Sequence, residues 1–333
     1  MNILITGASG FIGGYIVDNA LAKGLNVYAV VRKSSNRQYL QNSRINFVEL
    51  NFADPLKLID QLITLKEEIG TIDYVIHNAG VTKVLSYDDY NKVNFEFTKN
   101  FAEALKASNV GLRKFVFISS LAASGPGSQE TNTPIQSSDE PKPVTEYGRS
   151  KLKAEQFLNS LENFPYISLR PPAVFGPRDT DMFSVFQLIN NKLELYIGGA
   201  KQYLSFIYVK DLADAIICAT QSEVSQKTYF ISDNKYYDNV QFSKLIKRGM
   251  AKRTIVIKLP IFLVQVIAFF AEKFGKMTGK PSPLNVDKVN ELKSSNWLCD
   301  ANPFYNDTGF KAKYSLDGAI EETIKWYKNE NWL

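Results

Sequence analysis

Short apolar runs alternate with segments of helical periodicity through the first half of the chain. The runs typical of buried strands lie at residues 3–6, 26–31, 45–50, 73–77, 114–119 and 166–170. Between them, apolar residues recur at helical spacing at residues 11–23, 55–69, 88–108 and 146–162. Because such alternation is typical of a parallel sheet with helices on both faces, we predict a doubly wound α/β fold.

The alternation becomes irregular after about residue 175, which suggests a second structural part. We expect residues 1–175 to form the sheet domain and residues 203–222 to return to it. The remaining segments, 176–202 and 223–333, are expected to form a smaller, mostly helical part that holds the substrate.

The most apolar stretch of the chain is 255–274. Within it, residues 259–271 contain a single strongly polar side chain, Gln265. A helix needs about 20 apolar residues to span a bilayer, so this stretch is too short, and we predict a buried helix. Two alternatives remain open: a hydrophobic wall of the substrate pocket, and a peripheral membrane contact through residues 259–274.

Three glycines, Gly7, Gly10 and Gly13, follow the first predicted strand and open the first predicted helix. The first permits a tight turn, the second lets the backbone approach a pyrophosphate, and the third lets the helix pack against the strand. The helix start would add free N–H groups and the positive end of its dipole. An ordinary glycine turn is the alternative, but the strands on both sides favour a dinucleotide site.

Tyr147 and Lys151 lie four residues apart in a predicted helix, so both side chains would face one cleft. A free tyrosine has a pKa near 10, and a nearby ammonium would lower that pKa toward neutrality. Ser120 follows the preceding predicted strand and could hydrogen-bond the same reacting oxygen. We therefore predict a general acid–base site, with a surface helix pair as the alternative.

Charge and composition narrow the function further. The chain has 333 residues and a formal net charge of +5. Its basic residues form no long run, so we expect no nucleic-acid partner. His77 is the sole histidine, and Cys218 and Cys299 lie far apart, which argues against a metal site or a serine–histidine triad. No basic-then-apolar leader precedes the first strand, so we expect a cytoplasmic location.

The motifs together resemble the short-chain dehydrogenase/reductase superfamily. Those that carry the resemblance are Thr6-Gly7-x-x-Gly10-x-x-Gly13, Ser120 and Tyr147-x-x-x-Lys151. Its extended branch is similar in Leu169-Arg170-Pro171-Pro172-x-Val174-Phe175-Gly176-Pro177 and in Phe206–Ala213. That branch includes sugar-nucleotide epimerases and dehydratases, 3β-hydroxysteroid-dehydrogenase-like enzymes and dihydroflavonol-reductase-like enzymes. The resemblance implies a Rossmann sheet, an NAD(P) cofactor and a homodimer.

The resemblance also implies a role for each matching residue. Tyr147 would be the general acid–base, Lys151 its pKa partner and a ligand of the nicotinamide ribose, and Ser120 the donor to the substrate oxygen. Asn94 would belong to a proton path or be purely structural, and His77 would be structural. The residues expected to bind the cofactor are Thr6, Gly7, Ser9, Gly10, Phe11, Ile12, Gly13, Arg32, Asn51, Phe52, Asn78, Ala79, Gly80, Tyr147, Lys151, Pro171 and Val174.

The end of the second predicted strand bears on the choice of cofactor. NAD-binding proteins usually carry an acidic residue there, which binds the ribose 2′-hydroxyl. This chain has Arg32, and a guanidinium can bind a 2′-phosphate through two hydrogen bonds. We predict a preference for NADP(H), with NAD(H) as the alternative. Asn51 stands where many family members carry an aspartate near the adenine, so that contact would be weaker or different.

Two apolar positions bear on the substrate. Sugar-nucleotide enzymes of the branch usually carry an asparagine at the position of Ala173 and an arginine at that of Leu204, and both hold the diphosphate. Since both anchors are apolar here, we predict an enzyme that interconverts a ketone and a secondary alcohol on a hydrophobic, steroid-, keto-lipid- or flavonoid-like molecule. Its substrate residues would be Ala122, Ala173, Arg178 and Leu204.

Two other functions are compatible with parts of the sequence. A nucleotide-sugar epimerase or dehydratase with tightly bound NAD remains the alternative, because Arg178 could bind an anionic group in place of the missing anchors. Arg178 could equally be a solvated loop charge. A non-catalytic nucleotide-sensing protein is disfavoured, because Ser120, Tyr147 and Lys151 are all present.

Overall fold

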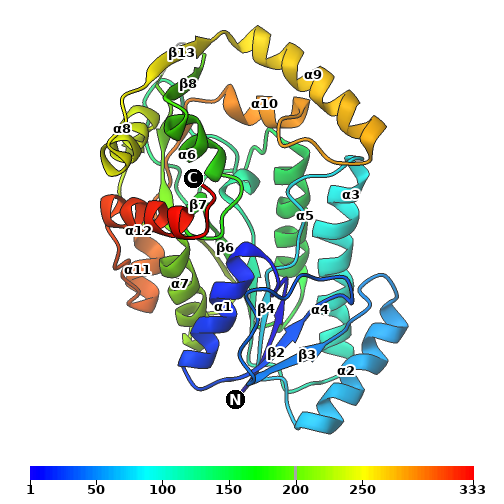
Figure 1. Cartoon of the computed structure of the whole chain (residues 1–333). Coiled ribbons are helices and arrows are strands. Elements are labelled where there is room, and N and C mark those ends of the chain that lie inside the picture. Colours follow the sequence, from blue (N-terminus) through cyan, green and yellow to red (C-terminus); the bar gives the residue numbers. More distant parts are fainter. Residues whose placement is uncertain (199–200) are drawn as a thin grey trace.

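A seven-stranded parallel sheet lies at the centre of the computed structural model, which describes residues 1–198 and 201–333 (Figure 1). Its order is β11-β6-β5-β4-β1-β2-β3, and every neighbouring pair is parallel. The strands are β1 (Asn2–Thr6), β2 (Asn26–Val30), β3 (Ile45–Val48), β4 (Tyr74–His77), β5 (Lys114–Ile118), β6 (Tyr166–Arg170) and β11 (Lys227–Phe230). The predicted doubly wound fold is confirmed, and β11 is a seventh strand that the sequence pattern did not indicate.

Alternate residues of the strands enter two separate cores on the two faces of the sheet. Ile3 and Ile5 of β1 belong to one buried cluster, and Leu4 belongs to the other. The first face is covered by α1 (Phe11–Ala22) and α7 (Val209–Gln221). The second is covered by α2 (Pro55–Ile69), α4 (Phe97–Ala107) and α5 (Glu146–Ser160).

The strand order creates the position at which ligands bind in this architecture. After β1 the chain enters α1 on one face, whereas after β4 it continues to α4 on the other. The connections therefore diverge at the carboxyl ends of β1 and β4, which is the position at which ligands bind in open α/β sheets. The glycine loop follows β1, so the fold places it at this position.

The predicted helix at 88–108 is present but changes its winding along its length. It consists of α3 (Asp88–Tyr90), a π-helical segment η1 (Asn91–Glu96) and α4. A π-helical turn inside a helix is frequently found at a functional site. Here it contains Asn94, one of the predicted site residues.

The rest of the chain adds small sheets and helices beyond the carboxyl edge of the main sheet. Strand β10 (Phe206–Tyr208) pairs with β7 (Ala173–Phe175), and α7 then packs on α1. The other elements are η2 (Leu121–Ala123), α6 (Phe183–Asn190), β8 (Leu193–Ile197), β9 (Tyr203–Leu204), β12 (Tyr237–Asp238), α8 (Asn239–Met250), β13 (Ile255–Leu259), α9 (Ile261–Thr278), α10 (Val286–Leu292), β14 (Asn296–Trp297), α11 (Asn302–Thr308) and α12 (Leu316–Asn329).

The expected division of the chain stays a prediction. Within residues 203–222, α7 packs with α1 on one face of the sheet, and β11, inside the expected segment 223–333, also joins the sheet. Residues 199 and 200, inside the expected segment 176–202, are outside the described residues.

The prediction of a buried helix at 255–274 is wrong. Residues 255–259 form the strand β13, and the helix α9 begins only after Pro260. Of α9, only Val264, Ala268 and Gly275 are buried, while most of its large apolar side chains face solvent. A search of the described residues found no helix that is long and apolar enough to cross a membrane.

Candidate active site

The glycine loop adopts a conformation that side chains would prevent. Gly7 has a φ of +65°, and a Cβ there would lie 2.7 Å from the carbonyl oxygen of Asn78. A Cβ on Gly13 would lie 2.0 Å from the carbonyl oxygen of Gly7, so the start of α1 packs directly on the loop. A Cβ on Gly10 would meet a single neighbour, at 3.3 Å, and Gly10 is exposed. The loop is therefore tight on its inner side and open on its outer side.

The start of α1 can bind an anion. Gly10 is its N-cap and provides no side-chain hydrogen bond, so the N–H groups of the first turn have no partner within the helix. No acidic residue occupies that turn. Ser9, Phe11 and Ile12 flank the open side of the loop and are partly buried. The loop and the helix start together fit the diphosphate of a dinucleotide.

A buried chain of hydrogen bonds fixes the carboxyl ends of β1 and β4. The Ala79 N–H donates to Thr6 Oγ1, which lies 2.8 Å from His77 Nδ1, and His77 Nε2 lies 3.0 Å from Thr98 Oγ1. Because the Thr98 hydroxyl donates to the Asn94 carbonyl, His77 must donate from Nε2 and accept at Nδ1. Burial and the charge of Lys151 lower the pKa of His77 to about 3, so the ring is neutral. His77 is a structural link between β1, β4 and α4.

Asn94 is fully buried, and its amide group holds the chain after β4 in place. Its Oδ1 accepts from the Val81 N–H, and its Nδ2 donates to the Val81 carbonyl and to Ser150 Oγ. A Cβ on Gly80 would lie 3.0 Å from Asn94 Oδ1 and 3.1 Å from Lys151 Nζ. The absence of a side chain at Gly80 therefore allows Asn94 and Lys151 to approach the same backbone segment. These contacts favour a positioning role for Asn94.

Ser120 and Tyr147 meet where β5 ends and α5 begins. Ser120 Oγ accepts from the Ala122 N–H, and the Ser120 side chain lies near enough to the Tyr147 phenol to lower its pKa. Tyr147 lies in the first turn of α5, which is capped by Thr145. A Cβ on Gly148 would lie 2.2 Å from the Ala122 carbonyl oxygen, so a glycine is required for α5 to approach η2 this closely.

Lys151 lies one turn further along α5 and is only 4% exposed. Its ammonium donates to the Ile118 carbonyl at 2.8 Å and lies 4.9 Å from the centre of the Phe117 ring. Burial lowers the pKa of Lys151 to about 8. Burial also raises the pKa of Tyr147 to about 12, although the neighbouring Ser120 side chain moderates the rise. The expected lowering of the Tyr147 pKa is thus not found in the chain by itself, because burial of the phenol dominates.

Two further contacts position α5, and neither was predicted from the sequence. Arg170, at the end of β6, forms a buried two-pronged ion pair with Glu155 of α5, with Nε–Oε1 and Nη2–Oε2 distances of 2.9 and 2.6 Å. Asp287 of α10 accepts from the Glu146 N–H at the start of α5. Arg170 belongs to the motif Leu169–Pro177, so the sequence did offer a signal for the first contact. The sequence offered no signal for the second, because Asp287 lies 141 residues from Glu146.

The adenosine end of the predicted cofactor site lies after β2 and β3. Arg32 is exposed at the end of β2, in a turn in which its N–H donates to Ser35 Oγ. No ion pair of Arg32 occurs within the described residues. Asn51 Oδ1 accepts from the Ala53 N–H, and Phe52 packs against His77 and Phe101. The guanidinium of Arg32 is therefore available for a phosphate.

The predicted substrate positions Ala173 and Leu204 lie close together. Ala173 of β7 pairs with Phe206 of β10, and Phe206 follows Leu204 by two residues in the chain. Both side chains are partly buried against the same apolar cluster. Leu204 also packs on a second cluster, whose buried members are Leu121, Ile135, Phe230, Trp297 and Cys299. The Pro171 carbonyl accepts from the Leu121 N–H, which ties this region to η2.

Arg178 is neither free nor solvated. Its guanidinium carbon lies 4.6 Å from the ring centre of Tyr15 and 4.4 Å from that of Tyr39, and Nη1 lies 3.5 Å from Asp18. Tyr15 and Asp18 belong to α1, so Arg178 clamps the loop after β7 against that helix. The predicted substrate role of Arg178 would require the side chain to leave these contacts.

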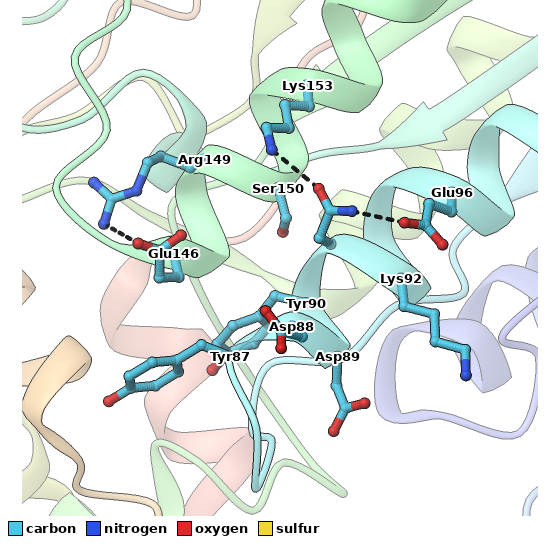
Figure 2. A pocket seen from close by; sticks show the side chains of 11 residues that line it. Tyr87, Asp88, Asp89, Tyr90, Lys92, Glu96, Glu146, Arg149, Ser150 and Lys153 are labelled. Carbon is cyan, nitrogen blue, oxygen red and sulfur yellow. Dashed lines mark hydrogen bonds and ion pairs between the residues drawn. The ribbon is translucent and has the colours of Figure 1, made fainter.

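A groove of about 680 Å³ lies on the outer side of η1 and α5 and is lined mainly by charged and polar residues (Figure 2). Lys153 donates to Asn91, Asn91 donates to Glu96, and Arg149 pairs with Glu146. Ser120, Tyr147 and Lys151 do not line it. This groove is therefore distinct from the predicted reaction site.

Three comparisons with known proteins agree with this geometry. The model of the NAD-dependent epimerase/dehydratase family matches residues 3–232. The chain is 24% identical to a ceramide reductase of Caulobacter vibrioides over 99% of its own length and 96% of that protein. It is 28% identical to a decarboxylating sterol-4-alpha-carboxylate 3-dehydrogenase of Dictyostelium discoideum, with 82% of this chain and 86% of that protein covered.

The fold is also found among solved structures. The UDP-glucose 4-epimerase of Thermotoga maritima, solved with UDP-glucose, superposes with a TM-score of 0.79 over 99% of this chain and 100% of that one. The sequence identity is 20%, so this likeness concerns the fold alone.

Proposed function

Because this chain belongs to the NAD-dependent epimerase/dehydratase family, it is an NAD(P)-dependent enzyme of the extended short-chain dehydrogenase/reductase type, and we propose that it interconverts a ketone and a secondary alcohol on a hydrophobic molecule. We further propose that NADP(H) is the preferred cofactor, since the end of β2 carries Arg32 and no carboxylate.

The observation that carries the substrate proposal is the pair Ala173 and Leu204. Both side chains pack against apolar clusters at the point where a diphosphate anchor would be needed. An anionic group placed there would lose hydrogen bonds worth about 1.5–3 kcal/mol each, since no charged partner replaces them. An apolar substrate has no such requirement and would gain from contact with this surface.

The names of two relatives support a lipid-like substrate. One is a ceramide reductase, and the other acts on a sterol carboxylate. Both names designate large, mostly apolar molecules with an oxygen at a ring or chain carbon. We therefore place a keto-lipid or a sterol-like ketone ahead of a flavonoid-like ring.

The chain's own residues supply proton transfer and orientation. The raised pKa of Tyr147 keeps its phenol protonated at neutral pH, so it can donate a proton to the oxygen of a ketone as that oxygen gains negative charge. Ser120 would hydrogen-bond the same oxygen. The nicotinamide, when bound, supplies or accepts the hydride. Lys151 keeps a positive charge beneath the site at neutral pH, and the glycine loop and the start of α1 would hold the diphosphate.

A nucleotide-sugar epimerase is the second candidate, because the family to which the chain belongs includes epimerases. Such an enzyme returns the hydride to its substrate and keeps its cofactor. The contacts of Arg178 with α1 count against it, since this side chain would have to replace the two apolar anchors.

A substrate panel separates these functions. The purified enzyme is given NADPH or NADH with steroid, 3-keto lipid and flavonoid-like ketones, and UDP and dTDP sugars serve as controls. We expect oxidation of NADPH with at least one apolar ketone and a higher Michaelis constant for NADH. Micromolar binding of a nucleotide sugar without turnover of any apolar ketone would overturn the substrate proposal. Equal or better use of NADH would overturn the cofactor proposal.

A further inference from the structure

Helix α9 exposes its large apolar side chains to solvent, unlike an ordinary surface helix. Its buried residues are small or medium in size, namely Val264, Ala268 and Gly275, and the first two pack with Val289 of α10 in one small cluster. Its large side chains point to solvent: Phe270 and Phe274 are 64% and 67% exposed. A surface helix of a globular protein normally buries its large apolar residues and exposes polar ones. Among the described residues, the apolar face of α9 therefore has no partner.

Strand β13 extends this exposed face. It precedes α9 directly, and both lie at the end of the molecule opposite the N-terminus (Figure 1). Residues 255–277 hold ten of the twenty large hydrophobic side chains found exposed among the described residues. We call these ten side chains the apolar surface: Ile255, Val256, Ile257, Phe262, Val266, Ile267, Phe269, Phe270, Phe274 and Met277. Such a concentration marks an interaction site.

The charges around the apolar surface identify the kind of partner. Residues 252–280 contain one acidic residue, Glu272, and six basic residues: Lys252, Arg253, Lys258, Lys273, Lys276 and Lys280. This segment thus has a formal charge of +5, equal to that of the whole chain. A second copy of the chain would bring the same positive charge to a symmetric contact. An anionic surface with an apolar interior is the complementary partner.

The apolar surface is connected to the predicted reaction site. Glu272 of α9 accepts from the Tyr87 hydroxyl at 2.9 Å. The Tyr87 ring stacks on Tyr90, with ring centres 6.5 Å apart, and the Tyr90 ring meets the Tyr147 ring edge-on at 5.9 Å. A hollow of about 280 Å³ lies between Tyr87 and the side chains of α9, including Phe269. Two tyrosines, Tyr87 and Tyr90, therefore connect α9 with the predicted catalytic Tyr147.

We propose that the apolar surface docks the enzyme on a bilayer that contains anionic phospholipids, and that the ketone passes from this bilayer to the site. The helix lies in the membrane interface with its phenylalanines among the acyl chains and its lysines at the headgroups. The docking stands on the exposed face and its charge, whereas the passage of the ketone rests on the proposed function.

Vesicle binding tests the docking without substrate or cofactor. The full chain is sedimented with vesicles of phosphatidylcholine alone and of phosphatidylcholine mixed with phosphatidylglycerol. We expect binding to the anionic vesicles to be at least about tenfold stronger and to weaken with salt. The variant Phe270→Ser/Phe274→Ser should lose about tenfold or more, and Lys273→Glu/Lys280→Glu should lose the preference for anionic vesicles.

Matched controls use exposed residues elsewhere on the chain. Leu56→Ser, on α2, replaces a side chain that is 76% exposed, and Lys57→Glu/Lys325→Glu reverses two exposed charges. Both controls should bind vesicles like the parent chain, and circular dichroism should show that all variants fold. Absent vesicle binding would overturn the docking. The docking proposal would also be overturned by a second outcome, in which Phe270→Ser/Phe274→Ser converts a dimer into a monomer and vesicle binding stays unchanged.

Activity on two substrate forms tests the passage of the ketone. Phe270→Ser/Phe274→Ser should turn over a short, water-soluble ketone like the parent enzyme and lose about tenfold or more on a long-chain ketone in anionic vesicles. Equal loss on both forms, or on neither, would overturn the passage from the bilayer. If the parent enzyme reduced no ketone at all, the proposed function would fail, while the vesicle measurements would still decide the docking.

Discussion

Helices α1 and α9 are both strongly apolar, yet the structure treats them in opposite ways. α1 buries Gly13, Gly14, Tyr15, Ile16, Val17, Ala20 and Leu21, whereas the longer α9 buries only three residues. α1 packs on the sheet and beside α7, so apolar neighbours cover it widely. α9 packs on a small apolar cluster. Apart from residues of α9 itself, the only buried member of this cluster among the described residues is Val289 of α10. The comparison teaches that an apolar sequence predicts that a surface will be covered but does not say by what.

The difference arises from what precedes each helix. α1 follows β1, a strand in the middle of the main sheet, and the glycine loop forces the helix back onto that sheet. α9 follows β13, which pairs with β8 in a separate two-stranded sheet. The main sheet is therefore out of reach for α9.

The largest expected effect is on turnover and concerns Tyr147, which lies in the same sheet domain as α1. Tyr147→Phe removes the proton donor, so kcat should fall by about 10²–10⁴-fold while NADPH still binds. Tyr90→Phe is the matched control, because its ring contacts Tyr147 whereas its hydroxyl donates to the Thr82 carbonyl. It should cost much less. Steady-state kinetics and NADPH fluorescence measure both, and near-normal turnover in Tyr147→Phe would refute the acid–base assignment.

The next effect tests the two helices directly through stability. Ile16→Ala opens a cavity under α1 and should lower the free energy of unfolding by about 2–5 kcal/mol. Phe270→Ala on α9 should change it by no more than about 0.5 kcal/mol, since this side chain is exposed. Urea unfolding of both variants without lipid gives the comparison. If both variants lost a similar amount of unfolding free energy, the face of α9 would be covered in solution by a second protein molecule.

A smaller effect is expected at the end of β2, beside the dinucleotide loop. Arg32→Ala removes the guanidinium that is available for a 2′-phosphate, so the Kd for NADPH should rise about 10- to 100-fold. The Kd for NADH should stay nearly unchanged. Arg44→Ala, an exposed arginine just before β3, is the control. Titration of cofactor fluorescence measures all four constants, and an equal change for both cofactors would exclude phosphate recognition by Arg32.

The smallest expected effect is a change in pH dependence. The pKa of Lys151 is lowered to about 8 by burial, so its ammonium is present below that pH and is lost above it. Reduction with NADPH should therefore fall to about half its maximum near pH 8. The raised pKa of Tyr147, about 12, keeps its proton in place over this range. Lys151→Arg should remove the decline if the variant binds NADPH, and a rate that stays constant well above pH 8 would contradict the assignment.

The sequence by itself determined the parts of the molecule that depend on local spacing. The strand–glycine–helix unit is one example: a Cβ at Gly13 would collide with the Gly7 carbonyl whatever the rest of the chain did. The six predicted strands are another, because continuous apolar runs are stable in a sheet that is covered on both faces. The four-residue spacing likewise placed Tyr147 and Lys151 on one side of α5.

The tertiary structure alone decided what depends on partners distant in the chain. The short β11 became a sheet strand because β6 offers it an edge, and Asp287 reached the start of α5 from 141 residues away. Burial of the Tyr147 phenol set its pKa above the ordinary value, against the expectation from Lys151 alone. The exposed face of α9 has the same cause. Hydrophobicity belongs to a residue, whereas burial depends on every element that packs around it, and within residues 1–198 and 201–333 no apolar element covers that face.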